Sequence, residues 1–415
     1  MNHKKRQVIA QSPKATGKVG FVIGSLMRGG AEMHLAQLLP VLKQRGWEVS
    51  VFLIGPTGPV ANDLQKAGIK IAPKQSVRVP PWLPVWLRRV TRFTLLSPKF
   101  LFFAWHQRRG IIHFFLPEAF IIGGMLTFSW HRRLIMSRRG MTTYRSKYPS
   151  PVIAIERFLQ HRMKLLLGNS ARVVDELLSD GVPKERVRLI YNGLALDRLD
   201  PPGAIREKLR DELGISQTEL VLVTLANLHP YKGHADLIKA LGKLKSAGRL
   251  PADWTLLLIG RNISLLGTEL LTTSSNNYQS RLESMCEKLD LQSHVKFLGE
   301  RADAPTLLRC ADIGVFPSHE EGFSNALIEQ MAAGLAIVAS DVGGNAEALD
   351  EGRAGIIVPP KEPTALAKAI GRLIEEPDTR KSFGETARAR AFENYTIARC
   401  ADDYENVYRE LLGHQ

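Results

Sequence analysis

Two glutamates separated by seven residues, Glu321 and Glu329, lie in the part of the sequence best suited to chemistry. Glu321 belongs to a loop that follows the apolar stretch ADIGVF, and Glu329 belongs to a predicted helix over residues 326–333. Ser324 is a good N-cap for this helix, and Gly334 is a good residue to end it. The spacing therefore places one carboxylate at the start of a helix and the other about two turns along it.

The same loop offers backbone groups that suit an anion. The first N–H groups of a helix have no partner within the helix, and the helix dipole adds positive potential there, which favours phosphate binding. Carboxylates beside such a site bind paired hydroxyl groups well. A nucleotide sugar carries both phosphate and hydroxyls, and it is the ligand predicted here. The residues expected to bind it are Gly322, Phe323, Ser324, Asn325 and Glu329. For such a glutamate pair alone, a capped surface helix with solvated carboxylates is the alternative.

Several other kinds of site lack their sequence motif. No two glycines are separated by one residue, so the GxGxxG dinucleotide fingerprint is absent, and so is the GxxxxGK[ST] phosphate loop. HExxH, GxSxG and Asp-x-Asp are also missing. The sequence therefore disfavours a serine hydrolase and a sugar-nucleotide site built on a metal ion, and no metal or cofactor is expected.

Alternating strand and helix patterns predict an α/β fold. One series begins with a strand at 19–23 and a helix over 31–44, and a second begins with a strand at 220–226 and a helix over 234–246. Each series is typical of a doubly wound, Rossmann-like domain with a parallel sheet. At 415 residues the chain is long enough for two such domains.

Cysteine usage and hydropathy bear on the compartment. The three cysteines, Cys286, Cys310 and Cys400, form no CxxC pair, so neither a disulfide framework nor a thiolate zinc site is expected. The basic start lacks an apolar stretch of signal-peptide length, and no uninterrupted apolar stretch is long enough to span a membrane. These features favour a reducing, cytoplasmic compartment.

Charge is divided unevenly along the chain. Residues 1–200 hold 32 Lys and Arg against 11 Asp and Glu, a net charge of +21, whereas the remainder holds 24 against 30, a net charge of −6. A basic half attracts nucleic acid, an anionic membrane or a polyanionic substrate. The two halves of the chain are therefore expected to face different partners.

The segment around the two glutamates closely resembles the retaining family-4 (group 1) glycosyltransferases of GT-B fold. Their signature EGFxxxxLEAxAxGxPVVxxxxGGxxE is matched by Glu321-Gly322-Phe323, Leu327-Ile328-Glu329, Met331 to Gly334, Gly343-Gly344 and Glu347. Other stretches resemble further family landmarks. These are Gly24 to Glu32, Asn169-Ser170, Tyr191-Asn192-Gly193 and Ala226 to Gly233, so that the resemblance covers about residues 17–395.

The resemblance implies a role for individual residues. Glu321 would contact the transferred sugar, and Glu329 would hold the ribose hydroxyls. Lys232 would neutralise the diphosphate leaving group, with a solvated turn lysine as the alternative. Gly29 and Gly30 would face the donor diphosphate and the acceptor from the other side of a cleft between the two domains. Retention would follow a front-face route in which the leaving phosphate takes the acceptor proton.

The chain departs from the family pattern at two places. Asn227 stands where the family commonly has an arginine, so His229 or Arg28 is a candidate for the second phosphate contact. The family's N-domain histidine is replaced within Met136 to Gly140, which makes Arg138 and Arg139 candidates for contact with phosphate or acceptor. His113, expected just after a strand, could also face the cleft. Solvated arginines and a structural histidine are the alternatives.

The expected domain boundaries follow from the patterns and the resemblance. They are a flexible basic tail at 1–16, an N-terminal acceptor-binding domain at 17–196, a hinge at 197–217, a C-terminal nucleotide-sugar-binding domain at 218–390, and a C-terminal helix at 391–415 that returns towards the N-terminal domain.

A basic and aromatic segment in the first half is a candidate membrane-docking surface. Between Arg78 and Arg162 the chain carries 15 Lys and Arg against two acidic residues, interleaved with tryptophans at 82, 86, 105 and 130. Interfacial aromatic groups and cations together favour an anionic inner-membrane surface, where a lipid-linked acceptor would lie. The alternative is a solvated basic face with tryptophans in the core; nucleic acid is not expected, because no binding module accompanies the charge.

The function predicted is therefore transfer of a sugar from a nucleotide donor to a glycan or lipid-linked acceptor, in the synthesis of a polysaccharide such as lipopolysaccharide. Two other functions stay open. One is a catalytically weak relative that acts as a membrane-associated partner in polysaccharide assembly, and the other is a sugar-nucleotide epimerase on the same fold. Turnover of a nucleotide sugar without an acceptor would distinguish the epimerase.

Overall fold

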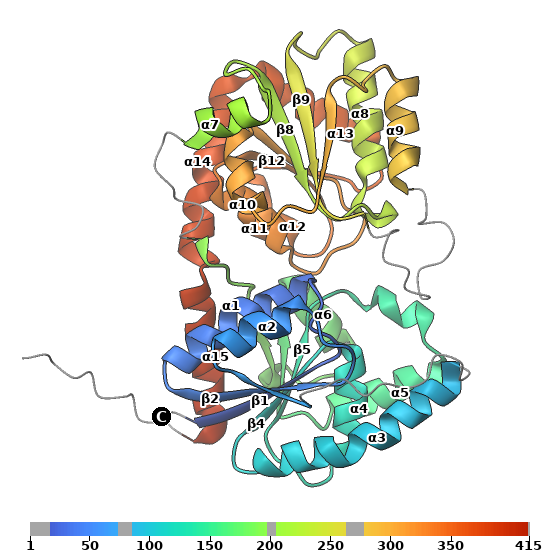
Figure 1. Cartoon of the computed structure of the whole chain (residues 1–415), viewed down its shortest axis with the longest axis vertical. Coiled ribbons are helices and arrows are strands. Elements are labelled where there is room, and N and C mark those ends of the chain that lie inside the picture. Colours follow the sequence, from blue (N-terminus) through green and yellow to red (C-terminus); the bar gives the residue numbers. More distant parts are fainter. Residues whose placement is uncertain (1–16, 74–84, 197–204, 263–277, 414–415) are drawn as a thin grey trace, which may run out of the picture. The chain divides into compact units, whose positions relative to one another are not determined.

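The computed structural model describes residues 17–73, 85–196, 205–262 and 278–413 (Figure 1). These residues form two compact units. Unit 1 is built from the described residues within 1–138, 148–167 and 401–415, and unit 2 from those within 139–147 and 168–400. The tail expected at 1–16 and the first part of the expected hinge, 197–204, lie outside the described residues.

The first sheet contains seven strands in the order β3-β2-β1-β4-β5-β6-β7. The pairs that join β1 to β2 and β4, β2 to β3, and β4 to β5 are parallel. The strands are β1 (Gly17–Ile23), β2 (Trp47–Leu53), β3 (Lys70–Ala72), β4 (Ile111–Phe115), β5 (Leu134–Arg138), β6 (Leu165–Gly168) and β7 (Val187–Leu189). The α-helices between them are α1 (Gly30–Gln44), α2 (Pro59–Lys66), α3 (Val85–His106), α4 (Pro117–Thr127), α5 (Ser150–Gln160) and α6 (Ala171–Ser179).

The last helix, α15 (Ile397–Leu412), contributes its residues from 401 onward to unit 1. Tyr408 is fully buried there, and a hydrogen bond of 2.8 Å joins its Oη atom to Nδ1 of His113. Trp47 donates its Nε1–H to the Glu405 carboxylate at 2.8 Å. The C-terminal residues are therefore part of the core of unit 1, although they lie some 300 residues from β4 in the sequence.

The second sheet lies in unit 2 and contains six parallel strands in the order β10-β9-β8-β11-β12-β13. The strands are β8 (Leu220–Leu225), β9 (Trp254–Ile259), β10 (Val295–Gly299), β11 (Ile313–Phe316), β12 (Ala336–Ser340) and β13 (Ile356–Val358). The α-helices are α7 (Ile205–Glu212), α8 (His234–Ser246), α9 (Tyr278–Lys288), α10 (Ala304–Leu307), α11 (Asn325–Ala332), α12 (Asn345–Ala348), α13 (Pro363–Glu375) and α14 (Pro377–Asn394). Short 3-10 turns add η4 (Pro230–Lys232) and η6 (Leu308–Cys310).

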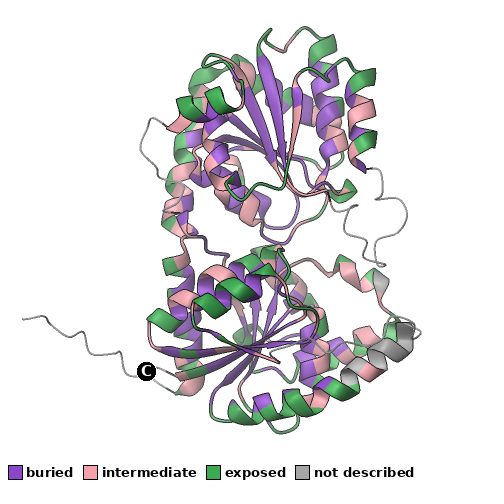
Figure 2. Ribbon diagram, viewed as in Figure 1, coloured by how far each residue is buried: buried purple, intermediate pink, exposed green. Residues whose placement is uncertain are grey.

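Helices cover both faces of the second sheet. Side chains from α8, α9 and α13 form one apolar cluster against the sheet, and side chains from α7, α10, α11 and α14 form the other. Figure 2 shows the strands buried between these helix layers, whose outer faces are exposed. Strands buried on both faces are near-continuous apolar runs, as in LVLVTL of β8 and TLLLI of β9, and this explains why the sequence pattern was clear.

Several elements expected from the sequence are confirmed. The helix expected at 234–246 has those bounds, and the helix expected at 326–333 is α11, one residue earlier at each end. One expectation is wrong: His113 lies in the middle of β4 and not after it. Of the helices in the described ranges, none has the length and apolar character that crossing a membrane requires.

The buried contact between α15 and β4 gives a stability prediction. Tyr408→Phe removes the hydroxyl that bonds to His113, which leaves one buried polar contact unmade. We expect the free energy of unfolding to fall by about 1–2 kcal/mol, measured as a lower urea midpoint. An unchanged midpoint would show that this hydrogen bond does not hold α15 in place.

Candidate functional site

Three loops from neighbouring strands of the second sheet carry the residues singled out in the sequence. β8, β11 and β12 are adjacent and parallel, so the loops that follow them leave the same edge of the sheet. The loop after β8 contains Lys232, the loop after β12 contains Gly343 and Gly344, and the loop after β11 contains Glu321. We call residues 317–324 the Glu321 loop.

Lys232 and Glu321 form an ion pair at this edge. Their side chains are only 16% and 11% exposed, so the pair is largely shielded from water. Burial, the largest single influence, lowers the pKa of Lys232, but the adjacent Glu321 carboxylate, together with Tyr231 and Glu320, outweighs burial and the pKa is raised. The ammonium group therefore stays charged at neutral pH in a place where a charge acts strongly.

The backbone on both sides of Lys232 packs against the Glu321 loop. Gly233 has a φ of 74°, and a Cβ atom there would lie 1.9 Å from the Pro317 carbonyl oxygen. On the other side, the His319 N–H donates to the Tyr231 carbonyl at 2.7 Å. These contacts fix the position of the lysine relative to the glutamate, and only glycine fits at position 233.

Glycines also allow the Glu321 loop to touch the loop after β12. Gly344 donates its N–H to the Gly322 carbonyl at 2.6 Å. A Cβ atom on Gly343, whose φ is 51°, would lie 2.3 Å from the Glu321 carbonyl oxygen. A Cβ atom on Gly322 would lie 2.5 Å from the carbonyl oxygen of Arg139. The loop is thus enclosed by backbone on two sides.

Two residues next to β7 hold the same loop by their side chains. Asn192 donates its Nδ2–H groups to the Phe323 carbonyl at 2.8 Å and to Oδ1 of Asn325 at 2.7 Å. Tyr191 donates its hydroxyl to Glu347 at 2.5 Å, and Glu347 also accepts the Ala171 N–H at 2.8 Å. The family landmarks around 169–171, 191–193 and 343–347 therefore meet at the Glu321 loop.

The start of α11 lacks the side-chain cap expected from Ser324. Ser324 occupies the N-cap position, but its side chain makes no capping hydrogen bond. The first N–H groups of the helix consequently have no side-chain cap from Ser324. Phe323, in contrast, is 5% exposed and packs its ring against Tyr191 and Tyr395, so only its backbone is available to a ligand.

Glu329 projects from α11, one of the helices that position the site. Within the residues that the structure describes, its carboxylate has neither a hydrogen-bond partner nor an ion-pair partner. The side chain keeps partial exposure, yet protein surrounds most of the carboxylate, and this loss of hydration raises its pKa to about 7. Such a carboxylate can accept hydrogen bonds from the donor groups of a ligand.

The two other residues expected near the donor phosphates shape the turn before Lys232. Oδ1 of Asn227 accepts the Arg261 N–H at 3.0 Å. Nδ1 of His229 accepts the Tyr231 N–H at 3.4 Å, which helps to form the 3-10 turn η4. The side chain of Asn227 therefore ties the loop after β8 to the loop after β9.

Five of the expected site residues lie in unit 1, namely Arg28, Gly29, Gly30, His113 and Arg138. Gly29 is the N-cap of α1 and Gly30 its first residue. His113 has no exposed surface, and its ring nitrogens contact Tyr408 and Ser137 at 2.8 Å each. These contacts fit the structural histidine that the sequence analysis gave as the alternative for His113.

Arg138 is also buried in unit 1. It is 2% exposed, and its guanidinium lies 3.3 Å from the Glu156 carboxylate, which is equally buried. The Nη2 atom of Arg138 is thus held by Glu156. Arg139 belongs to unit 2, where its carbonyl accepts from Asn169 at 3.4 Å and lies against Gly322. The acceptor role of the two arginines stays a prediction.

Sequence reasoning named Tyr191, Asn192 and Glu347 only as landmarks and assigned them no role. Only their place in the matched motifs indicated that these residues matter. Residue type alone does not distinguish an asparagine that hydrogen-bonds to a loop from one on the surface. Within the described parts of the chain, no group of three or more His, Cys, Asp or Glu side chains is arranged to hold a metal ion.

The close approach at Gly343 gives a second prediction. Gly343→Ala forces a Cβ atom onto the Glu321 carbonyl, whereas Gly248→Ala, at a glycine with φ of 66° and open space around its Cβ position, adds only backbone strain. We expect the free energy of unfolding to fall by at least about 2 kcal/mol more for Gly343→Ala than for the control, as measured by thermal unfolding. Equal losses would show that the two loops are not in tight contact.

The raised pKa of Glu329 gives a third prediction. Between the ordinary pKa of 4.5 and the folded value of about 7, the folded protein holds a proton that the unfolded chain has released, so stability falls as the pH rises through this window. Glu329→Gln removes this effect. Relative to wild type, the variant should gain about 2–3 kcal/mol between pH 4.5 and pH 8, measured by urea unfolding. Glu287→Gln, on the exposed side of α9, is the control, and an equal gain there would contradict the assignment.

Known proteins resemble this chain over much of its length. It is 26% identical over 205 residues to N-acetyl-alpha-D-glucosaminyl L-malate synthase of Bacillus anthracis, a match that covers 49% of each chain. It is 25% identical over 413 residues to D-inositol 3-phosphate glycosyltransferase of Corynebacterium glutamicum, which covers 93% of each chain. The first three relatives are matched over 49 to 63% of their own length.

Solved structures share the fold. HepE of Anabaena, crystallised in complex with UDP, superposes with a TM-score of 0.78 at 23% identity, over 95% of this chain and 100% of that chain. This likeness shows a common architecture of two parallel-sheet, Rossmann-like domains, which is the GT-B fold predicted from the sequence.

Family profiles cover both halves of the chain. Residues 28–198 match the profile of glycosyltransferase family 4, and residues 205–390 match that of glycosyl transferases group 1. The second match contains Lys232, Glu321, Glu329 and Gly343, whose geometry is described above. The chain therefore belongs to the family-4, group 1 glycosyltransferases.

Proposed function

We propose that this protein transfers a sugar from a nucleoside diphosphate donor to a glycan or lipid-linked acceptor, with retention of anomeric configuration and without a metal ion. The observation that supports this function most is the shielded pair of Lys232 and Glu321, in the loop that leads into α11, whose N-cap side chain makes no capping hydrogen bond. This arrangement places a fixed cation, backbone N–H groups and a carboxylate at one edge of the sheet.

The cation suits the leaving group. A diphosphate gains negative charge as its bond to the sugar breaks, and a fixed ammonium group in a poorly hydrated site stabilises that charge. Lys232 is already charged and already oriented, because Gly233 and the Glu321 loop hold it. The lysine thus supplies the charge stabilisation that a metal ion supplies in other transferases.

The carboxylates suit the hydroxyl groups of the donor. The unpartnered carboxylate of Glu329 accepts two hydrogen bonds when ionised, as paired ribose hydroxyls require. Glu321, held by Lys232, would contact a hydroxyl of the transferred sugar. In this proposal the base is uracil, because HepE structures were determined in complex with UDP and with UDP-glucose.

The proposed reaction has a simple balance. The bond between the anomeric carbon and the β-phosphate oxygen breaks, and a bond from that carbon to the acceptor oxygen forms on the same face of the sugar. The acceptor proton passes to the departing phosphate oxygen. Lys232 stabilises the diphosphate, and no protein side chain becomes covalently attached to the sugar.

Unit 1 carries exposed aromatic and basic side chains that we propose bind an anionic membrane. Exposed apolar side chains lie on α3 and around α4 and α5, with Phe102 67%, Trp105 57% and Phe158 44% exposed. Cations stack on two of these rings, Arg108 on Trp105 at 4.7 Å and Arg162 on Phe158 at 5.0 Å. We call these exposed aromatic and basic side chains of α3 to α5 the aromatic-basic face. Trp82 lies outside the described residues, and the side chain of the tryptophan at 86 is not described.

Rings beside cations are what an interface of acyl chains and anionic headgroups binds. We therefore place the protein at the cytoplasmic face of the inner membrane, held peripherally by the aromatic-basic face. A lipid-linked acceptor would lie in the same surface. Such an acceptor is typical of polysaccharide and lipopolysaccharide synthesis.

Nucleotide binding tests the donor site. In the presence of a chelator, UDP should raise the melting temperature of the wild type more than GDP does, because a ligand that binds only the folded state stabilises it. Glu329→Ala should lose this increase, whereas Lys368→Ala on the exposed side of α13 should keep it.

Lys232→Ala should lower kcat by about 100-fold or more. A shift that requires a divalent metal, or none with any nucleotide, would contradict the proposal.

Vesicle binding tests the membrane surface. The protein should sediment with phosphatidylglycerol vesicles at low ionic strength and less at high ionic strength, because screening weakens the headgroup contacts. Phe102→Ser with Trp105→Ser should reduce sedimentation about tenfold, and Leu289→Ser, a comparably apolar exposed residue on unit 2, should not. Equal sedimentation of both variants would contradict membrane binding through the aromatic-basic face.

A further inference from the structure

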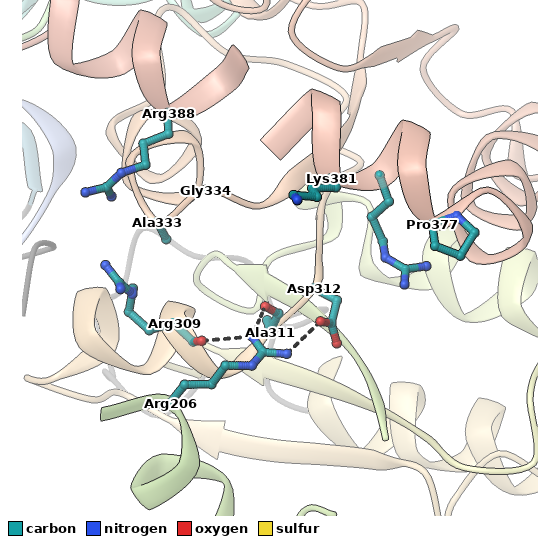
Figure 3. A pocket seen from close by; sticks show the side chains of 10 residues that line it. Arg206, Arg309, Ala311, Asp312, Ala333, Gly334, Pro377, Lys381 and Arg388 are labelled. Atoms are coloured by element: carbon teal, nitrogen blue, oxygen red, sulfur yellow. Dashed lines mark hydrogen bonds and ion pairs between the residues drawn. The ribbon is translucent and has the colours of Figure 1, made fainter. Parts of the chain in front are cut away.

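Unit 2 has a basic pocket at the opposite edge of the second sheet from the Glu321 loop. Its volume is about 490 Å³. The residues that line it, drawn in Figure 3, are Arg206, Arg309, Ala311, Asp312, Ala333, Gly334, Pro377, Arg380, Lys381 and Arg388. They come from α7, from η6, from the residues between η6 and β11, from the two residues that follow α11, and from α14. We call this the α14 pocket.

The α14 pocket is separate from the donor site. Asp312 directly precedes β11, whereas the Glu321 loop follows β11. Likewise, α11 begins at Asn325 beside the Glu321 loop and ends at Ala332 next to the pocket residue Ala333. The helix has eight residues, so its two ends are about 12 Å apart. A ligand in the pocket would therefore leave the donor site accessible.

The lining is strongly cationic. Four arginines and one lysine face one acidic residue, Asp312, in a half of the chain that carries a net negative charge overall. Asp312 is itself neutralised, since Arg206 contacts it at 2.7 Å and the buried Arg210 at 3.0 Å. The charge of the pocket is thus a local concentration of cations and not a reflection of composition.

Backbone contacts orient the arginines. Arg206 donates to the carbonyls of Arg309 at 3.1 Å and Ala311 at 2.8 Å, contacts that Figure 3 marks. Arg380 donates to the Leu373 carbonyl at 2.7 Å. Arg388 donates to the Ala332 carbonyl and stacks on Phe392 at 4.6 Å. Carbonyl oxygens and a ring fix a guanidinium while leaving its formal charge in place, which resembles the way phosphate sites are built.

We propose that the α14 pocket binds a small anion that carries two or more phosphate groups. Guanidinium groups bind phosphate with two parallel hydrogen bonds, and several of them around one pocket match a ligand with several negative charges. The volume admits a ligand of pyrophosphate or sugar-bisphosphate size. This site is additional to the proposed donor site and does not depend on it.

Inorganic pyrophosphate is the probe, titrated into the full-length protein by calorimetry at low ionic strength. Arg380→Gln with Lys381→Gln should weaken its binding by about tenfold or more. The matched control, Lys288→Gln with Lys368→Gln, removes the same charge from exposed positions on α9 and α13 and should leave the affinity nearly unchanged. Lys232→Gln should retain binding in the pocket.

Three results would overturn the proposal. They are no binding to the wild type, equal weakening by the pocket and control variants, and loss of binding through Lys232→Gln alone, which would place pyrophosphate at the Glu321 loop. Because Arg380 also contacts backbone, Lys381→Glu serves as a second variant. Its side chain is 78% exposed, so the protein should fold, and reversal of its charge should still weaken binding. These results are distinguishable from a failure of the donor site, which UDP reports separately through Glu329→Ala.

Discussion

The close contact between two backbone loops is the constraint on which the rest of the site depends. Gly344 bonds to the Gly322 carbonyl at 2.6 Å, and Gly343 leaves no room for a side chain against the Glu321 carbonyl. The side chain of Glu321 faces Lys232, and the loop after β12 fixes the backbone of Glu321 through Gly343 and Gly344. Any residue with a Cβ atom at 343 or 344 would push the loop away from β12, and the ion pair would lose its geometry. A shielded charge pair is costly unless both partners are held, and the glycines supply that restraint.

Strand order explains why distant segments serve one site. β8, β11 and β12 are neighbours in the sheet, so residues near 232, 321 and 343 meet at one edge although 87 residues lie between β8 and β11. Asn192 and the Tyr191–Glu347 contact add support from outside the sheet. The opposite edge has different chemistry, because α7, η6 and α14 bring arginines together there. One helix thus borders a carboxylate-rich site at its start and a basic pocket near its end.

The sequence predicted those strands and helices that have a clear apolar pattern and characteristic residues at their ends. Apolar runs such as LVLVTL marked the strands, and Ser324 and Gly334 marked the ends of α11 to within one residue. It could not place His113, because an apolar strand such as IIHFF tolerates a histidine only if buried partners satisfy it, and Tyr408 lies almost 300 residues away. It gave no sign of the α14 pocket, whose arginines are scattered over 183 positions and are joined only by packing. Contacts of this kind depend on tertiary structure rather than on local pattern.

Hydrogen exchange in the presence of UDP tests the central claim, that the Glu321 loop and its glycine support form the donor site. We expect slower amide exchange in peptides that cover residues 319–329 and 341–348, because the ligand would occupy the N–H groups at the start of α11 and stabilise the adjoining loops. Peptides from α9 and α13 should exchange at unchanged rates. Protection confined to other parts of the chain, with residues 319–329 unaffected by saturating UDP, would contradict the account.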